Sequence, residues 1–98
     1  MTDFNTQVER NLKAKGLEKA GNTEAAIKLY EQNISENFKG NFPYDRLVVI
    51  YKKRKESKNV IRVLENAVYV FENIIDPIRA DRLQKLNKFK KQLEKAQE

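Results

Sequence analysis

The sequence predicts an all-α fold of five helices, in which antiparallel helical hairpins stack side by side. The main observation is an internal repeat, because a shift of 34 residues places apolar or small positions on one another without an insertion. A period in the low thirties is typical of stacked helical hairpins. In addition, apolar residues recur at three–four spacing, and only three Gly and two Pro interrupt the chain. The matched positions are Ala14 with Val48, Leu17 with Tyr51, Ala26 with Val60, Ile27 with Ile61, Tyr30 with Leu64, and Asn33 with Ala67.

The first predicted hairpin begins near Thr6, because Thr6 and Glu9 have the spacing of a capping box. The alternative is an earlier start, with Phe4 in an extra turn upstream. Gly16 lies inside this helix, either because a neighbouring helix approaches closely or as a tolerated glycine. Gly21 suits the left-handed conformation that ends a helix, and Asn22 or its successor can cap the next one. A connection this short makes the two helices antiparallel neighbours. The apolar stripe of the second helix comprises Ala26, Ile27, Tyr30 and Ile34.

The second predicted hairpin begins at Pro43 with the most apolar helix of the chain, which we expect to be central, with neighbours on two sides. The β-branched run Val60–Leu64 taken alone could be a strand, but three–four spacing continues to Phe71 and favours a helix. Asp76 followed by Pro77 predicts the start of a final helix. Its narrow apolar stripe would cover the open edge of the stack. The members of this stripe are Ile75, Ile78, Leu86, Phe89 and Leu93.

The amino-acid composition excludes several kinds of functional site. The chain has no Cys and no His, which excludes disulfides, thiolate chemistry, zinc sites of the usual ligand types and histidine acid–base catalysis. It also lacks a glycine-rich phosphate loop. We therefore expect a non-enzyme without cofactor or metal. Because the chain has neither an apolar run of about 18 residues nor the pattern of a signal peptide, the expected location is cytoplasmic.

These features together resemble the tetratricopeptide repeat (TPR) family, and the resemblance covers nearly the whole chain. The small and large positions of the family's hairpin fall on the matched pairs above, and Gly21-Asn22 resembles its Gly-Asp turn. The resemblance implies a short right-handed solenoid in a single domain, residues 1–98. Its parts are repeat 1 at about 7–40, repeat 2 at about 41–74 and a capping helix at about 76–98.

The chain departs from the family pattern at several positions. Arg10 and Lys13 stand where large apolar residues are usual, and Lys55 replaces the turn glycine in the second repeat. Pro43 and Pro77 both lie later than the proline that usually separates repeats. These departures make the motif degenerate and leave a plain helical bundle as the alternative.

The resemblance also implies a function, which is binding a peptide or helix in a groove lined by the first, third and fifth helices. The family's groove-lining positions fall on Asn11, Lys15, Glu18, Asp45, Val49, Lys52, Arg79, Leu83 and Leu86. Some members hold a terminal carboxylate with converging cationic and amide side chains. Asn11, Lys15 and Arg79 are of the right types, but their order does not reproduce that clamp. The alternative for each residue is an ordinary solvated helix surface.

The net charge of +6 comes entirely from residues 41–98, and this asymmetry favours an acidic partner, either a protein or a nucleic acid. One alternative function is therefore nucleic-acid association through the basic third and fifth helices. Another is structural self-association through the apolar edges of a short stack. The densest basic run would be the phosphate-binding patch, although cations also complement the end of a helix dipole. This run is Lys52, Lys53, Arg54, Lys55 and Lys58. Phe42 and Tyr69 are the aromatic residues without an assigned packing position.

Overall fold

The computed structural model of the chain describes residues 2–98. Within this range it is all-α, with five α-helices, one π-helical turn and no strand, so the predicted fold class is confirmed. The run Val60–Leu64 is helical. The elements are α1 (Phe4–Lys19), α2 (Thr23–Ser35), α3 (Phe42–Lys53), α4 (Ser57–Tyr69), the π-helical turn η1 (Val70–Ile74) and α5 (Arg82–Ala96).

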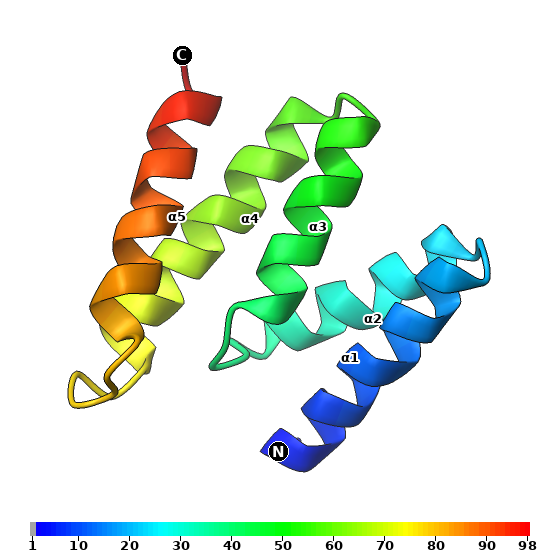
Figure 1. Cartoon of the computed structure of the whole chain (residues 1–98), viewed down its shortest axis with the longest axis horizontal. Coiled ribbons are helices and arrows are strands. Elements are labelled where there is room, and N and C mark those ends of the chain that lie inside the picture. Colours follow the sequence, from blue (N-terminus) through cyan, green and yellow to red (C-terminus); the bar gives the residue numbers. More distant parts are fainter. Residues whose placement is uncertain (1) are drawn as a thin grey trace.

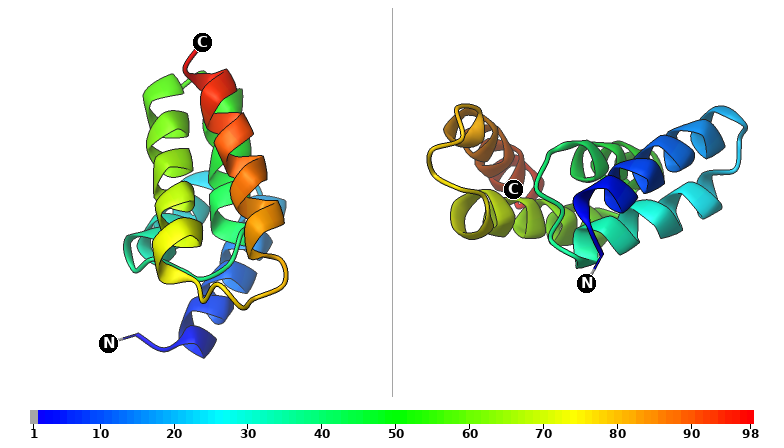
Figure 2. Two further views of the ribbon diagram at one scale, coloured as in Figure 1. Left: turned by 90° about the vertical axis from the view of Figure 1, so that its left-hand side faces the viewer. Right: turned by 90° about the horizontal axis from the view of Figure 1, so that it is seen from below.

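The helices form two layers, with α1, α3 and α5 in one and α2 and α4 in the other (Figure 2, right). The chain measures 35 by 35 by 20 Å along its principal axes. The shortest of these matches two helices of about 10 Å diameter. Helix α3 lies in the middle and packs against both α2 and α4 (Figure 1). The predicted central position of this apolar helix is therefore confirmed.

The internal repeat is visible in the burial of side chains. Ala14 and Val48, which the shift of 34 residues superposes, are both buried. The same holds for three further pairs, namely Ala26 with Val60, Tyr30 with Leu64, and Asn33 with Ala67. Ile27 and Ile61 are both half-buried. Five of the six matched pairs thus have the same burial in both hairpins. In the sixth pair, Leu17 is half-buried and Tyr51 is buried.

The turns inside the two hairpins also share one geometry. Gly21 and Lys55 both adopt the left-handed conformation, with φ of 83° and 58°. The next residue in each case donates its N–H to a carbonyl oxygen five positions earlier, Asn22 to Leu17 at 2.8 Å and Glu56 to Tyr51 at 2.9 Å. This is the hydrogen bond of a Schellman motif. Lys55 therefore takes the conformation that the glycine takes in the first hairpin.

The first helix begins earlier than predicted and is capped differently. Asp3 is its N-cap, accepting a hydrogen bond from the N–H of Thr6 at 2.8 Å, so the predicted capping box at Thr6 is wrong. Asn22 caps α2 as predicted, accepting from the N–H of Ala25. A Cβ added to Gly16 would meet no atom within 4 Å. Close approach of another helix therefore does not explain this glycine.

The final helix begins at Arg82 rather than at Asp76, and this prediction is corrected. The Asp76 carboxylate accepts a hydrogen bond from the N–H of Ile78 at 3.0 Å, and its carbonyl oxygen accepts one from the N–H of Arg79 at 3.0 Å. Asp76 thus caps an isolated turn instead of a helix. Ile78 is 87% exposed and does not belong to the apolar stripe. The buried contacts of α5 come from Leu86 and Phe89, against α4 and η1.

A polar network explains why Arg10 stands at a position where the resemblance implies an apolar residue. Its Nη1 donates to Glu36 Oε1 at 2.8 Å and to Asn33 Oδ1 at 3.0 Å. Asn33 is fully buried, and its Nδ2 donates to Asn11 Oδ1 and to the Gln7 carbonyl oxygen, both at 2.8 Å. Polar contacts therefore join α1 to α2 where apolar packing was expected.

Candidate functional site

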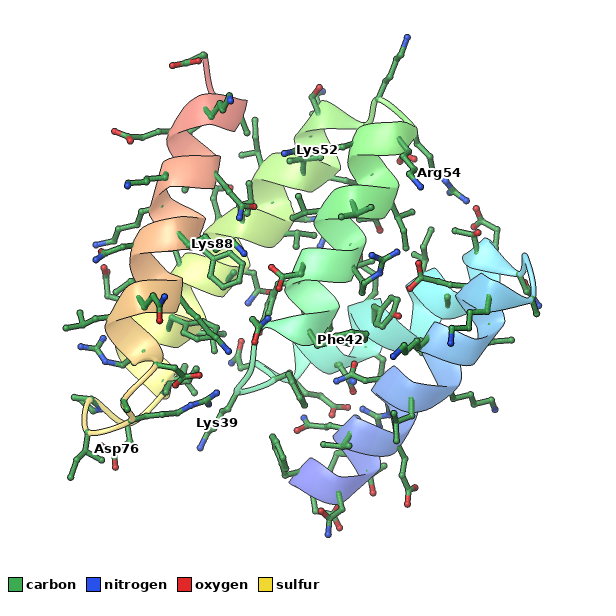
Figure 3. The ribbon with its side chains drawn as sticks, in the orientation of Figure 1. Lys39, Phe42, Lys52, Arg54, Asp76 and Lys88 are labelled. Carbon is green, nitrogen blue, oxygen red and sulfur yellow. The ribbon has the colours of Figure 1, made fainter. Side chains whose placement is uncertain are left out.

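A cleft lies between the C-terminal half of α1 and one side of α3. Its main part has a volume of ≈ 470 Å³, and a smaller part of ≈ 250 Å³ adjoins it. The two parts share Glu18, Lys19 and Arg46, and we call them together the α1–α3 cleft. Its other lining residues are Lys15, Thr23, Phe42, Val49, Ile50, Lys53 and Arg54. Phe42 lies at the start of α3 and Arg54 just beyond its end, so the cleft follows the length of this helix (Figure 3).

Three charged and polar side chains from three helices fix the wall of the cleft. Arg46 of α3 holds Glu18 of α1 with two hydrogen bonds, from Nη2 at 2.6 Å and from Nε at 3.1 Å. The hydroxyl of Tyr30, from α2, donates to the same carboxylate at 2.6 Å. The Phe42 ring meets Tyr30 edge to face at 6.0 Å between centroids. These contacts set the position of α3 relative to the first hairpin.

The ionisation of this cluster follows from its surroundings. Partial burial disfavours the charged form of Glu18, yet hydrogen bonds from Arg46 and Tyr30 outweigh it and keep the pKa below its usual value. Burial raises the pKa of Tyr30, and the neighbouring Glu18 raises it further. Glu18 is therefore an anion at neutral pH and Tyr30 a neutral donor. A stable ion pair of this kind serves positioning and gives no sign of a proton-transfer role.

The cleft carries more positive charge than its internal pairs neutralise. Glu18 neutralises Arg46, and Arg54 pairs with Glu24. Among residues 2–98, Lys15, Lys19 and Lys53 have no ion-pair partner. Val49, which is 37% exposed, lines the main part of the cleft together with Lys19 and Lys53, whereas Lys15 lines the smaller part. The arrangement can bind an anionic segment with an apolar side chain, because cations line the same cleft as an exposed apolar surface.

Of the nine predicted groove residues, the structure brings three together in the α1–α3 cleft: Lys15, Glu18 and Val49. Asn11 is instead buried in the network around Asn33. Asp45 accepts a hydrogen bond from Asn41 at 2.6 Å. Both residues therefore have internal roles.

The other four predicted groove residues lie away from this cleft. Lys52 lies on the opposite side of α3 from Arg54 (Figure 3). Arg79 precedes α5 and donates to the carbonyl oxygen of Lys39 at 2.6 Å, and it also pairs with Asp81. Leu83 is exposed on α5, and Leu86 is part of the core. Asn11, Lys15 and Arg79 thus do not converge, and they form no carboxylate clamp.

Phe42, Arg46 and Ile50 also line the cleft, although the sequence did not predict them as site residues. The predicted positions on α3 were Asp45, Val49 and Lys52, whereas the lining stripe contains Phe42, Arg46, Val49 or Ile50, and Lys53. The two stripes differ by one residue, which is a rotation of about 100° around the helix. The three–four spacing on α3 is compatible with both sets of positions and does not show which set lines the cleft. The choice depends on how α3 is rotated against α1 and α2.

The predicted basic patch is divided between two sides of the molecule. Lys53 and Arg54 line the α1–α3 cleft, whereas Lys52 and Lys55 line a separate hollow of ≈ 280 Å³ that also contains Ala96 of α5. Lys52 and Lys53 belong to the last turn of α3, where cations complement the helix dipole. The run therefore does not present its charges on one surface. Of the two residues left without a packing position, Phe42 is half-buried against the core and Tyr69 is 51% exposed.

Residues 2–98 contain no cluster of three or more side chains suited to hold a metal ion. Within the same range, no helix has the length and apolar character required to cross a bilayer. Comparison with known protein families, with curated proteins and with solved structures gives no match to this chain.

Proposed function

We propose that this chain is a non-catalytic protein-binding module of the tetratricopeptide repeat type, which holds an acidic peptide in the α1–α3 cleft. The observation that carries the proposal is that three lysines without an ion-pair partner line the same cleft as the exposed side chain of Val49. The repeat of 34 residues, with matching burial and matching turns, supports the repeat type.

The walls of the cleft favour binding without rearrangement. Glu18, Tyr30 and Arg46 are already hydrogen-bonded to one another, so α1 and α3 are held at a fixed separation. A ligand therefore does not need to order these groups, and this lowers the entropic cost of association. The lysine side chains are exposed, so each contact with a carboxylate is worth only about 0.2–1 kcal/mol and weakens with salt. Three such contacts and the apolar contact at Val49 add up to only a few kcal/mol, so we expect weak binding with a Kd of about 1 mM.

The proposal is tested by fluorescence anisotropy with a labelled peptide in which glutamates flank a central leucine. A peptide of equal length with lysines in place of the glutamates is the ligand control. We expect the acidic peptide to bind and the basic one not to bind. In the variant Lys15→Glu/Lys19→Glu/Lys53→Glu, binding should fall at least tenfold.

A control variant distinguishes peptide binding in the cleft from attraction of the peptide by the net charge of the protein. The variant Lys28→Glu/Lys88→Glu/Lys95→Glu has the same net charge, but its changes lie at exposed positions that do not line the cleft. It should bind the acidic peptide within about twofold of the unmodified chain. Equal losses in both triple variants would show that net charge, and not the cleft, attracts the peptide.

The nucleic-acid alternative has less support, because the basic run that would form its contact surface is divided between two sides of α3. A gel shift with random duplex DNA tests it directly. A salt-sensitive shift that Lys52→Glu/Lys53→Glu abolishes, without acidic-peptide binding, would replace the proposal by nucleic-acid association.

A further inference from the structure

The outer face of α4 and α5 forms one open end of the helical stack. In the left view of Figure 2 the two helices lie side by side, with no other helix in front of them. A hollow of ≈ 640 Å³ lies along this face, and we call it the α4–α5 face. Its lining residues are Val68, Glu72, Asn87, Lys90, Lys91, Leu93, Glu94 and Gln97.

The internal repeat indicates what kind of element this face can accept. Helix α4 completes the second hairpin by packing against α3 and, less extensively, against α2. Helix α5 packs against α4 in the same layer as α3, but no helix within residues 2–98 covers α4 and α5 in turn. A helix in that position would repeat the role of α4 and would run antiparallel to α5.

We propose that a second copy of this chain fills this position, forming a two-fold symmetric dimer in which the two α5 helices pack antiparallel across the α4–α5 face. A two-fold axis perpendicular to α5 makes the two copies of this helix antiparallel, which is the orientation that the repeat requires. Each α5 then serves as the covering helix of the other chain. The half-buried side chains of Val68 and Leu93 lie at the centre of the contact.

The charges on the α4–α5 face are self-complementary under this symmetry. Lys91 and Glu94 are exposed and three residues apart, and neither has an ion-pair partner within residues 2–98. In an antiparallel pair whose axis passes between residues 92 and 93, Lys91 of one subunit lies opposite Glu94 of the partner subunit. Because of the two-fold symmetry, the interface contains two such Lys91–Glu94 ion pairs.

The carboxylates on the α4–α5 face disfavour binding of a polyanion in place of a second copy of the chain. Glu72 and Glu94 lie within the face, and Glu72 binds Lys90 at 2.9 Å, so a polyanion such as nucleic acid or an anionic membrane would meet carboxylates there. Helix α1 lies at the opposite end of the stack from α5 (Figure 1), and the α1–α3 cleft shares no lining residue with the α4–α5 face, so the cleft stays open in the dimer. The dimer therefore does not depend on the proposed peptide binding.

Sedimentation velocity between low micromolar and several hundred micromolar protein tests the dimer. The unmodified chain should shift from the monomer mass of 11.5 kDa towards twice that value as its concentration rises. Lys91→Glu places two glutamates opposite each other, and Glu94→Lys places two lysines opposite each other. Each single variant alone should weaken dimerisation at least tenfold.

Mixing the two single variants provides the decisive result. In the mixed dimer, each glutamate of the Lys91→Glu chain faces a lysine of the Glu94→Lys chain, so both contacts are attractive. The mixture should regain a dimer that neither variant forms alone. An effect within one chain cannot be repaired by a second chain in this way.

The control Lys28→Glu changes an exposed lysine of α2 and should dimerise like the unmodified chain. Circular dichroism verifies that every variant stays helical. A strict monomer at the highest concentration overturns the proposal. So does a dimer that both single variants leave intact, or a mixture that remains monomeric. Acidic-peptide binding measured on the same variants should be unchanged, which separates failure of the dimer from failure of the cleft.

Discussion

Tyr30 and Tyr51 make equivalent contacts in successive parts of the stack, because each donates its hydroxyl hydrogen to a glutamate of the preceding helix. The same glutamate also accepts hydrogen bonds from an arginine of the helix that follows the tyrosine. Glu18 is bound by Arg46, and Glu31 is bound by both terminal nitrogens of Arg62 at 3.0 and 2.6 Å. Each cluster thus connects three consecutive helices. Together they join α1, α2, α3 and α4.

The first prediction concerns the hydroxyl of Tyr30. Tyr30→Phe removes the hydrogen bond to Glu18 and keeps the buried ring, so we expect the free energy of unfolding to fall by about 1.5 kcal/mol. Urea denaturation followed by circular dichroism measures the change. Tyr69→Phe is the control, since Tyr69 is 51% exposed and should change stability by less than about 0.5 kcal/mol. Equal effects at the two positions would contradict a structural role for the Tyr30–Glu18 contact.

The second prediction uses the left-handed turn at Lys55. Its φ of 58° is unfavourable for a residue with a Cβ, and glycine adopts it freely. Lys55→Gly should therefore stabilise the chain by roughly 1 kcal/mol, seen as a higher midpoint in urea. The same substitution at Lys58, in the first turn of α4, should lower stability, because glycine weakens a helix. A loss of stability at both positions would show that the turn does not strain Lys55.

The third prediction concerns two glycines with opposite surroundings. Gly16 is exposed within α1 and an added Cβ meets no atom within 4 Å, so Gly16→Ala should stabilise by up to about 1 kcal/mol. At Gly40 an added Cβ would lie 2.8 Å from the ring of Phe38. Gly40→Ala should therefore be destabilising. Thermal unfolding of the two variants compares them, and a loss of stability in Gly16→Ala would show that α1 does not accept a Cβ at this position.

The fold could be predicted from the sequence because its signals are local. The spacing of apolar side chains determines which face of each helix is buried, and the short turn at Gly21-Asn22 makes the first two helices antiparallel. Both can be read within about 15 residues. The start of α5 was placed wrongly for the same reason. Asp76 and Pro77 have the local pattern of a helix start, but the helix forms only where Leu86 and Phe89 pack against the rest of the fold.

The candidate site could be predicted only in part, because it depends on how separate helices meet. Glu18 and Arg46 are 28 residues apart, and their contact requires a particular rotation of α3 against α1. The sequence contains both residues but no signal that pairs them. Lys15 and Val49 were predicted because the groove-lining positions that the resemblance implies fall on them, and both are exposed in the structure. Arg46 was missed because the chosen stripe on α3 was displaced by one residue.

The last prediction is the dependence of stability on pH. The pKa of Glu18 lies below its ordinary value of 4.5, since hydrogen bonds from Arg46 and Tyr30 outweigh its partial burial. The pKa of Glu36 is also lowered, chiefly by hydrogen bonds from Arg10 and Gln7. A carboxyl group with a lower pKa in the folded state stabilises the fold fully above its unfolded pKa, and this contribution is lost as the pH falls through the folded value. The melting temperature should therefore be nearly constant from pH 6 to pH 8, outside the range in which these groups titrate, and should fall below about pH 4.5.

The variant Glu18→Gln tests the assignment. It should melt at a lower temperature than the unmodified chain at neutral pH, because Arg46 loses its ionised partner. The difference between the two proteins should shrink as the pH is lowered, since the glutamate of the unmodified chain becomes protonated. Glu98→Gln, at an exposed position, should leave the whole curve unchanged. A constant difference between Glu18→Gln and the unmodified chain at every pH would mean that the charge of Glu18 does not stabilise the fold.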